Sequence, residues 1–406
     1  MTVAATIDFA AVTDKTWDVL VVGAGPAGAM AARETARLGA SVLLVDKAEF
    51  PRSKVCGCSL NRRSLALLDD VGLGELPERY GGVPLHRFHL AVNSRHAIVP
   101  LPGGVSLSRQ TLDAGLVDEA IAAGVEFLPG VVGRLGDVER RSRSVALQMG
   151  RHELTASARV VLAADGLGSR LLSGEGRKHE VAGNSRIGCS VIVESYPPFY
   201  DCGTIFMACG KGGYVGLVRL ESGCLDVAAA FDPQFVKRAG GLGSAATTIL
   251  AEAGFPRIPN LAGPSWRGTP LLTRRALRPA AERVLAIGDA AGYIEPFTGE
   301  GIFWALASGK AVGPLARRAV QTWDDDIAAR WSMLYHHKIA RRQRVCRVVA
   351  EVLRHPRLTG WLVAGVARLP ALATPLVQYL NFTPPARKGI VNHEHGNCRA
   401  WNGPAP

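Results

Sequence analysis

The stretch Asp18-Val-Leu-Val-Val-Gly23-Ala-Gly25-Pro26-Ala27-Gly28 decides how this chain begins to fold. A short apolar run that ends in Gly-x-Gly-x-x-Gly predicts a β-strand that turns sharply into a helix. The first glycine permits the tight turn, the second lets the backbone approach a pyrophosphate, and the third lets the helix pack close to the strand. The helix start then presents free N–H groups and a positive dipole end to phosphates.

A second apolar run, residues 40–45, ends in Asp46. This acid lies about 20 residues past the glycines, where it can accept hydrogen bonds from ribose hydroxyls. Strand, glycine turn, helix, second strand and acid in this order predict a dinucleotide site. The alternative is a nucleotide-free α/β turn, in which the glycines serve packing only.

Length and composition are those of a folded protein without a membrane span. The chain has 406 residues, of which 48% are hydrophobic and 20% charged, and this length suggests two or three domains. The segment before Trp17 lacks a basic region and carries Asp8 and Asp14, so it does not resemble a signal peptide. No apolar run reaches the ~18–20 residues that a spanning helix needs. We therefore expect a cytoplasmic protein.

Cysteines and charge exclude several classes of function. Eight cysteines in a chain this long do not form a disulfide framework, and Cys56-x-Cys58 is too tight for the usual C-x-x-C pattern. His393-x-His395 with Cys398 lies in a polar tail, so we predict no metal site.

The net charge is +12, and half of this excess falls within residues 317–357, where valines at helical spacing are flanked by arginines. Such a helix packs on its own domain or contacts an anionic surface, so we expect no nucleic-acid partner.

The loop after Asp46 carries two cations and two thiols. Directly behind a ribose-binding strand, it can run along a cofactor toward its reactive ring. Lys47, Arg52 and Lys54 are candidates to contact that cofactor, because Arg52 and Lys54 could neutralise a phosphate or a reduced, anionic ring. The alternative is a surface loop with solvated cations and a buried cysteine.

The second half of the chain supplies the other end of the site. An apolar strand ends in Asp165-Gly166, residues 175–275 alternate as in an antiparallel sheet, and another strand ends in Gly288-Asp289. Asp289 can bind the hydroxyls of a polyol. The N–H groups near residues 299–302 can face the electron-rich edge of a flavin ring and stabilise its reduced form. Glycine loops at both ends of the chain, converging on one extended cofactor, predict FAD rather than NAD.

These motifs resemble those of a known family. Gly23-x-Gly25-x-x-Gly28 with Glu34 and Asp46, then Ala164-Asp165-Gly166-x-x-Ser169, and Gly288-Asp289-Ala-Ala resemble the three fingerprints of p-hydroxybenzoate-hydroxylase-type flavoproteins. Pro51-Arg52-x-Lys54-x-Cys56-Gly57 and the run from Gly292 to Gly309 resemble the geranylgeranyl-reductase branch. The resemblance covers about residues 16–320.

The resemblance implies an α/β fold with a glutathione-reductase-type, Rossmann-like FAD-binding domain, an interposed antiparallel-sheet substrate domain and a C-terminal helical segment. It divides the chain into an FAD-binding domain of residues 16–84, 105–175 and 276–322, a substrate domain of residues 85–104 and 176–275, and a C-terminal helical region and tail of residues 323–406. FAD would be held without a covalent bond, and NAD(P)H would act as a transient reductant without a domain of its own.

Carried over position by position, the resemblance assigns roles to individual residues. Glu34, Asp46, Arg109 and Asp289 would bind FAD, Asp165-Gly166 would lie near the pyrophosphate, and Cys56-Gly57 would lie beside the flavin ring. The full set of predicted cofactor-binding residues is Gly23, Gly25, Pro26, Ala27, Gly28, Glu34, Asp46, Lys47, Arg52, Lys54, Cys56, Gly57, Arg109, Asp165, Gly166, Gly288, Asp289, Pro296, Gly299, Gly301 and Ile302. Tyr214 and Gly216 are candidates to face the substrate, and Cys56 is the candidate catalytic residue, with packing as its alternative.

The chemistry is left open between two readings, both of which use flavin reduced by NAD(P)H on an apolar phenolic, polyketide or isoprenoid metabolite. Prenyl reductases tend to carry an aromatic-x-Trp-x-Phe-Pro segment, and the nearest match, residues 214–219, lacks its Trp and Phe-Pro. This departure favours monooxygenation through a peroxyflavin. Reduction of a carbon–carbon double bond, with Cys56 or water as proton donor, is the alternative. A flavin electron-transfer or membrane-surface module is a third reading.

The apolar segment 360–380 is interrupted by Arg368, Pro370 and Pro375. It predicts a pair of short helices that cap the substrate domain. The alternative is an interfacial anchor beside the basic helix, which would give the protein a peripheral membrane contact and help it extract a lipid-like substrate.

Overall fold

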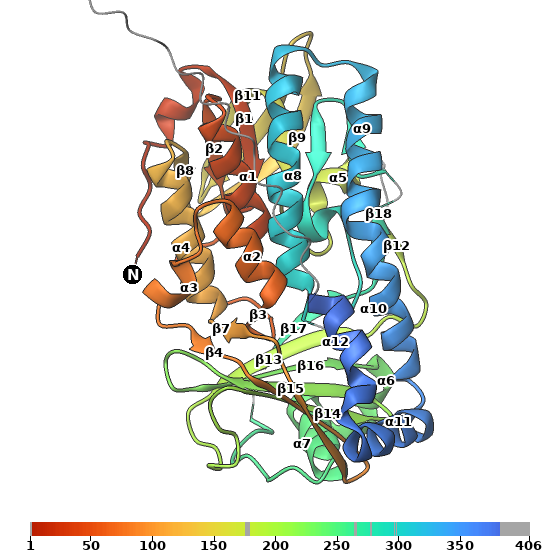
Figure 1. The fold of residues 1–406 in the computed structure, drawn as a ribbon. Helices are drawn as coiled ribbons and strands as arrows, with labels where there is room; N and C mark the ends of the chain where they lie inside the picture. Colours follow the sequence, from red (N-terminus) through yellow and green to blue (C-terminus); the bar gives the residue numbers. More distant parts are fainter. Residues whose placement is uncertain are drawn as a thin grey trace, which may run out of the picture.

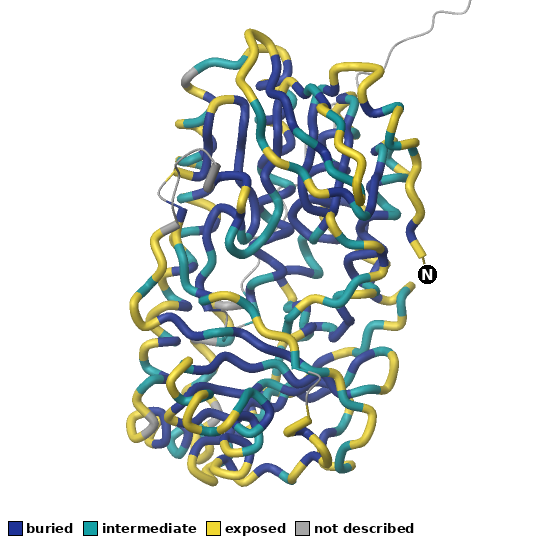
Figure 2. Tube along the Cα trace, turned by 180° about the vertical axis from the view of Figure 1, so that it is seen from behind, coloured by how far each residue is buried: buried dark blue, intermediate teal, exposed yellow. Residues whose placement is uncertain are grey.

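In the computed structural model, two sheets lie one above the other and a column of C-terminal helices runs along one side of both (Figure 1). The structure describes residues 2–174, 179–263, 266–276, 278–295, 297 and 299–381. Buried backbone fills the centre of both parts, and exposed residues gather on the connecting loops (Figure 2).

The first sheet is built around the parallel strand β1, as the glycine motif predicts. Its strands follow the order β19-β20-β11-β1-β2-β8, and β9 and β10 extend it antiparallel from β11. β1 is buried along most of its length, which suits a strand covered on both faces. The strands of this sheet are β1 (Thr16–Val22), β2 (Val42–Val45), β8 (Glu126–Leu128), β9 (Val131–Val138), β10 (Arg143–Met149), β11 (His152–Ala163), β19 (Ala280–Ala281) and β20 (Val284–Ala286).

Helices α1 (Pro26–Arg37), α4 (Arg109–Ala122) and α8 (Gly301–Gln321) pack around this sheet. Two helical glycines allow unusually close approach. A Cβ atom on Gly28 would lie 1.8 Å from the Gly23 carbonyl oxygen, and one on Gly309 would lie 2.4 Å from the Ala27 carbonyl oxygen. The third glycine of the motif therefore does serve close helix–strand packing, as its position predicts.

The second sheet has seven strands in the order β17-β13-β16-β15-β14-β5-β6. All its pairs are antiparallel except β14 with β5, which is parallel because the β5–β6 hairpin comes from an earlier part of the chain. Helices α6 (Pro233–Ala239) and α7 (Leu242–Glu252) lie on this part of the molecule. The strands are β5 (Arg87–Val92), β6 (Arg95–Pro100), β13 (Ile187–Val193), β14 (Thr204–Gly210), β15 (Gly213–Arg219), β16 (Leu225–Phe231) and β17 (Arg267–Leu271).

Strand alternation gives this second sheet two different faces. On β16, Leu225 and Val227 join the core beneath α7, whereas Ala230 joins a separate apolar cluster with residues of the C-terminal helices. Asp226 and Ala228 share the face of Ala230. A Cβ atom on Gly57 would lie 4.0 Å from the Ala228 Cβ, so this face is the one that meets the loop of residues 51–58.

The C-terminal helices descend from the first sheet to the second (Figure 1). They are α9 (Asp325–Tyr335), the π-helical turn η3 (His336–Ala340), α10 (Arg341–Val352), α11 (Pro356–Arg368), η4 (Pro370–Ala373) and α12 (Thr374–Asn381). Val363 of α11 is 1% exposed and packs with residues of β5, β6, β14 and β15. Within the described residues, no helix is both long enough and apolar enough to cross a bilayer.

The remaining elements are short and connect the larger ones. Two small three-stranded sheets, β3-β7-β4 and β12-β18-β21, lie outside the two main sheets. The short elements are η1 (Ala10–Thr13), β3 (Ser59–Asn61), α2 (Arg62–Asp70), α3 (Leu76–Arg79), β4 (Val83–Pro84), β7 (Gly104–Ser106), α5 (Arg170–Gly174), β12 (His179–Val181), β18 (Arg274–Ala276), η2 (Gly288–Ala291) and β21 (Gly292–Tyr293). This architecture confirms the predicted fold class, whereas the domain boundaries remain a proposal.

Candidate functional site: a cofactor cradle beside two thiols

The glycine turn and Asp46 meet directly. Gly23 has φ +107°, and a Cβ atom there would lie 2.2 Å from the Ala164 carbonyl oxygen, so only glycine fits this turn. The Ala24 N–H donates to Asp46 Oδ2 over 2.8 Å, and the Ala48 N–H donates to Oδ1 over 2.9 Å. The carboxylate is thereby held at the end of β2, with Pro26 and Ala27 opening α1 beside it.

Two arginines lie against the glycine turn. A Cβ atom on Gly25 would lie 3.5 Å from Arg52 Nη2 and 3.8 Å from Arg109 Nη2. Asp113, one helical turn after Arg109, positions both arginines: it accepts two 2.8 Å hydrogen bonds from Arg109, and Arg52 Nη1 lies 3.1 Å from its Oδ2. Two guanidinium groups beside a helix N-terminus are suited to bind a pyrophosphate.

Lys54 joins these arginines from the same loop, and we call Arg52, Lys54 and Arg109 the cation cluster. The Lys54 Nζ atom lies 3.3 Å from where a Cβ atom on Gly166 would be, and the nearby Asp289 favours the charged form of Lys54. Burial, followed by the charges of Arg109 and Arg52, lowers the pKa of Lys54. Burial raises the pKa of Asp289. The cation cluster therefore links the loops after β1, β2, β11 and β20, which are far apart in sequence.

Several polar atoms in this cradle are available to a ligand. Asp165 uses Oδ2 to accept the Arg170 and Leu171 N–H groups, whereas its buried Oδ1 has no hydrogen-bond partner among the described residues. Within the same described part of the chain, the buried Nε of Arg52 is also without a hydrogen-bond partner. Three features suit an adenine dinucleotide such as FAD. They are a turn that only glycine can adopt, two guanidinium groups beside a phosphate position, and buried polar atoms without a hydrogen-bond partner among the described residues.

The motif before α8 is anchored by a buried ion pair. Glu300 is 1% exposed, Arg63 Nη1 donates to its Oε1 over 2.7 Å, and the Cys346 thiol donates to its Oε2 over 3.4 Å. Gly299 has φ +70° and lies against the Ser59 hydroxyl. Gly301 and Ile302 begin α8, so their N–H groups are free of the intrahelical ladder, as predicted for the flavin-ring end. Pro296, which the sequence also assigned here, lies outside the described residues.

Cys56 and Cys58 form a thiol pair on the loop between β2 and β3. The Cys58 N–H donates to Cys56 Sγ over 3.4 Å, and the Cys58 thiol donates to the Cys56 carbonyl oxygen over 3.8 Å. A hydrogen bond from the Cys58 thiol, aided by the positive charge of Arg109, lowers the pKa of Cys56 to about 6. The same interaction with Cys56, together with burial, raises the pKa of Cys58.

Asp226 faces this thiol pair from the second sheet. It is 2% exposed, and its Oδ2 has no hydrogen-bond partner among the described residues. Burial and the adjacent Cys56 raise its pKa well above the usual range, while a hydrogen bond with Cys58 acts in the opposite direction. Its surroundings therefore favour the protonated form of the Asp226 carboxyl group.

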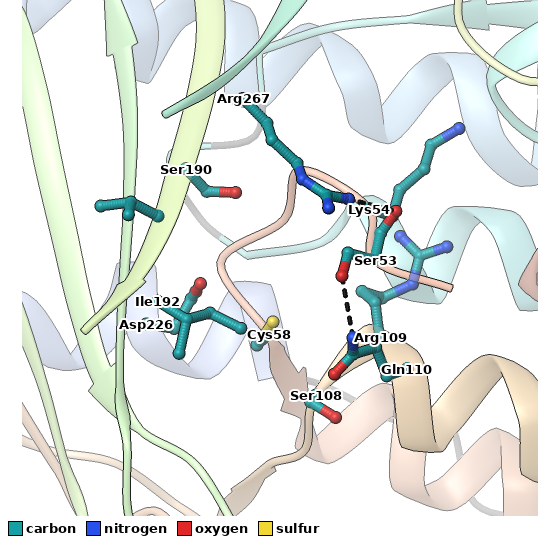
Figure 3. A pocket seen from close by; sticks show the side chains of 11 residues that line it. Ser53, Lys54, Cys58, Ser108, Arg109, Gln110, Ser190, Ile192, Asp226 and Arg267 are labelled. Atoms are coloured by element: carbon teal, nitrogen blue, oxygen red, sulfur yellow. Dashed lines mark hydrogen bonds between the residues drawn. The ribbon is translucent and has the colours of Figure 1, made fainter. Parts of the chain in front are cut away.

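A cavity of about 170 Å³ opens onto Cys58 and Asp226 (Figure 3). Cys58 lies between Asp226 on β16 and Arg109 at the start of α4, and a hydrogen bond from Gln110 to Ser53 closes another side. The lining residues are Ser53, Lys54, Cys58, Ser108, Arg109, Gln110, Ser190, Val191, Ile192, Asp226 and Arg267.

The two predicted substrate residues lie on the same face of the sheet. Tyr214 is 7% exposed, its ring meets that of Phe297 edge-on at 5.1 Å, and the Arg186 guanidinium lies 5.7 Å from its ring centre. Arg186 is held in turn by a buried ion pair with Glu295 at 2.7 Å. A Cβ atom on Gly216 would lie 3.2 Å from Met207 Cε.

The structure shows the surroundings of two further predicted cofactor residues, and their role stays a prediction. Glu34 pairs with Arg33 and lies against Gly313 of α8. Lys47 is exposed just after β2. No disulfide joins two of the seven described cysteines, and the described residues contain no group of three potential metal ligands. His393, His395 and Cys398 lie outside the described residues.

Sequence reasoning missed three members of the site: Asp113, Asp226 and the partnership of Cys58 with Cys56. Asp113 had a usable signal, because it stands four residues after Arg109 on a predicted helix, the spacing of an intrahelical ion pair. Asp226 stands within an otherwise apolar strand, which marks a buried acid that needs an explanation.

Comparisons with known proteins agree with this geometry. The model of the FAD binding domain family matches residues 16–195. The menaquinone reductase of Mycolicibacterium smegmatis is 28% identical over 392 residues, which cover 88% of this chain and 90% of that protein. A digeranylgeranylglycerophospholipid reductase of Methanopyrus kandleri is 28% identical over 365 residues, which cover 83% and 90%.

Solved structures show the same fold. A geranylgeranyl bacteriochlorophyll reductase-like protein of Thermoplasma acidophilum superposes with a TM-score of 0.73 at 20% identity, covering 90% of this chain and 98% of that one. The flavin-dependent brominase Bmp2 also gives 0.73, at 17% identity, covering 90% and 94%.

The chain is thus an FAD-dependent oxidoreductase, with its dinucleotide cradle on the first sheet. The match to the FAD binding domain model and the similarity to these two reductases confirm the resemblance stated from the motifs.

Proposed function

We propose that this enzyme uses reduced FAD to reduce a carbon–carbon double bond in an apolar, isoprenoid-type substrate. The observation that carries the proposal is the burial of Asp226 beside Cys56 and Cys58, with one carboxyl oxygen that has no hydrogen-bond partner among the described residues and a raised pKa. The names of the menaquinone and digeranylgeranylglycerophospholipid reductases support the same class of substrate. The departure of residues 214–219 from prenyl reductases favoured monooxygenation, which is the alternative that the experiment below distinguishes.

Reduction of an alkene needs a hydride at one carbon and a proton at the other. Bound FAD supplies the hydride after it has been reduced. The chain must supply the proton, and Cys56 is a poor resting donor because its lowered pKa leaves it as a thiolate at neutral pH. The raised pKa of Asp226 favours its protonated form, and the Cys58 thiol next to it, whose pKa is also raised, can pass a proton on. We therefore assign the acid role to Asp226 rather than to Cys56.

The apolar character of the site supports the substrate class. Between the second sheet and the segment after β21, Tyr214, Phe297 and Phe88 form edge-on aromatic contacts at 5.1 and 6.3 Å. Met207 and Val363 belong to the same apolar cluster. Such a surface suits a hydrocarbon chain, with the buried Arg186–Glu295 pair as the polar group nearest to Tyr214.

The test is anaerobic stopped-flow spectroscopy of Asp226→Asn with Ser190→Ala, a neighbour in the same cavity without a titratable proton, as control. We expect reduction of the flavin by NADPH to be unchanged and its reoxidation by a polyprenyl alkene to slow by about 10²–10⁴-fold in Asp226→Asn only. If alkenes do not reoxidise the reduced flavin of the wild-type enzyme, and the enzyme forms a hydroxylated product with oxygen instead, monooxygenation replaces this proposal.

We further propose NAD(P)H as the reductant, with its phosphates in a basic cavity of about 840 Å³ between β18, η3 and α10. Among the residues that the structure describes, Arg275, Arg278 and Arg347 have no ion-pair partner. The cavity arginines and histidines are Arg274, Arg275, Arg278, Arg344, Arg347, His336 and His337, against the acids Glu282 and Asp324. We expect Arg344→Ala/Arg347→Ala to raise KM for NADPH about tenfold at unchanged kcat. Arg238→Ala on α6 is the control, and an unchanged KM contradicts the assignment.

We also propose that α11 contacts an anionic lipid surface. Its inward face packs on β5 and β6, yet its solvent face exposes Leu358, Trp361 and Leu362 by 48%, 72% and 52%. Arg357 and Arg368 flank these side chains. An apolar solvent face with basic flanks fits the headgroup region of a bilayer. Wild type should sediment with vesicles that contain phosphatidylglycerol more than with neutral ones, and Trp361→Ala/Leu362→Ser should not. Equal recovery of both proteins would contradict the contact.

A further inference from the structure

We propose that Cys56 and Cys58 are a redox-active dithiol that closes to a disulfide in response to peroxide and is reopened by the reduced flavin. This inference goes beyond the proposed alkene reduction and applies equally if the enzyme is an oxygenase. It rests on four features of the loop: the orientation of the two thiols, the charge beside them, a proton acceptor, and a path for a small oxidant.

The backbone brings the two sulfur atoms toward each other. Only Gly57 separates the cysteines, and Cys58 has φ +47°, a left-handed conformation that non-glycine residues adopt rarely. In this conformation the Cys58 N–H and thiol both hydrogen-bond back to Cys56, at 3.4 Å to Sγ and 3.8 Å to the carbonyl oxygen. A backbone turn that folds one cysteine onto another suits an intraloop disulfide.

The surroundings separate this pair from the other cysteines. The Arg109 guanidinium, itself fixed by Asp113, stabilises negative charge on Cys56. By contrast, burial raises the pKa of Cys189 and of Cys209 to about 12, so these thiols stay protonated and unreactive. Of the two members of the pair, Cys56 is the nucleophile and Cys58 the resolving thiol.

The cavity gives an oxidant access, and Asp226 gives the proton a route. Cys56 is half-buried, and its partner Cys58 lines the cavity of about 170 Å³, which has room for hydrogen peroxide. Asp226 lines the same cavity, and its Oδ2 has no hydrogen-bond partner among the described residues. Hydrogen peroxide is the expected oxidant, because reduced flavin that reacts with oxygen without substrate releases it.

The chemistry balances in three steps. The Cys56 thiolate attacks peroxide, so that an S–O bond forms, the O–O bond breaks and hydroxide leaves. Cys58 sulfur then displaces that oxygen, so that the S–S bond forms and water leaves with the Cys58 proton, which passes through the Asp226 carboxyl group. Reduced FAD, when bound, would supply the two electrons and one proton that reopen the disulfide and restore the Cys56 thiolate and the Cys58 thiol.

The experiment counts thiols in the FAD-loaded enzyme and does not depend on turnover. Trypsin cleaves after Lys54 and Arg62, so the peptide of residues 55–62 contains both cysteines of the pair and none of the others. After stoichiometric peroxide, denaturation and alkylation, we expect this peptide unalkylated and lighter by two hydrogens. After anaerobic photoreduction of the flavin, we expect it doubly alkylated again.

Variants make the result specific. Cys58→Ser should leave Cys56 as a sulfenic or sulfinic acid without an S–S bond, and Cys189→Ala should behave as wild type; the flavin spectrum of each variant checks its fold. The proposal is wrong if the peptide of residues 55–62 stays doubly alkylated while other cysteines oxidise. It is also wrong if the disulfide forms but reduction of the flavin does not reopen it. Because alkene turnover is not the readout, loss of the proposed function and loss of the dithiol are distinguishable.

Discussion

Replacement of Asp113 by Asn tests how the cation cluster is held together. Asp113 is fully buried and is the shared anion of Arg52 and Arg109. Asp113 accepts two 2.8 Å hydrogen bonds from Arg109, one with each carboxylate oxygen. The Asn side chain in the variant can accept only one of them, because its NH₂ group is a donor and faces the guanidinium donors. Loss of one partner from a buried ion pair costs about 3–5 kcal/mol. With an unfolding entropy of about 2.1 cal/mol/K per residue, this corresponds to a fall in Tm of about 4–6 °C for the 406-residue chain.

The matched control is Glu119→Gln on the same helix. Glu119 pairs with Arg79 at 2.7 Å, but the Arg79 side chain is half exposed, so water replaces the lost interaction and Tm should hardly change. Thermal unfolding is followed by circular dichroism with and without FAD. Saturating FAD should narrow the gap between Asp113→Asn and wild type, because the pyrophosphate supplies negative charge beside the two arginines. Equal Tm values for the two variants would refute the reasoning.

Three further predictions concern the turn, the thiol and the acid. Gly28→Ala should give protein without flavin absorbance, because its Cβ atom would lie 1.8 Å from a carbonyl oxygen of the turn, whereas Gly268→Ala, with open space around it, should bind FAD normally. Alkylation of Cys56 should rise with pH around about 6, and Cys58→Ala should move this midpoint toward the ordinary value of 9.0; a wild-type midpoint there would contradict the assigned hydrogen bond. Reoxidation of reduced flavin by an alkene should fall as pH rises through the raised pKa of Asp226, since the donor loses its proton, and a rate that rises instead would exclude this acid.

Local patterns were sufficient to predict the frame of the molecule. The glycine turn, Asp46 and the strand ends at Asp165 and Asp289 follow from short-range rules, because each depends on a strand, a turn and a helix that are adjacent in sequence. Parallel strands place their carboxyl ends along one edge, so loops far apart in the chain converge there. The role of Glu34 stays a prediction, because a helical position fixes a side chain's direction relative to its own helix and not relative to a ligand.

The strand order of the second sheet could not be predicted from such short-range rules. The alternation of apolar and polar residues along 185–231 predicts antiparallel strands, but it does not predict which other strand pairs with β14. In the structure that strand is β5 of the β5–β6 hairpin, and the pairing is parallel. The pairing is decided by the fit of buried side chains across the sheet and by chain connectivity, which are properties of the whole fold.

What this sequence determined by itself is the cofactor: the glycine turn and Asp46 are spaced by the covalent geometry and hydrogen bonding of one β-α-β unit, and the later strand ends at Asp165 and Asp289 follow local rules of the same kind. What only the tertiary structure decided is the chemistry beside that cofactor. Cys58 and Asp226 are 168 positions apart in the chain. They meet because one face of β16 packs on the loop of residues 51–58. Burial at that contact raises the pKa of Asp226, whereas the hydrogen bond with Cys58 and the charge of Arg109 lower the pKa of Cys56 against the effect of burial.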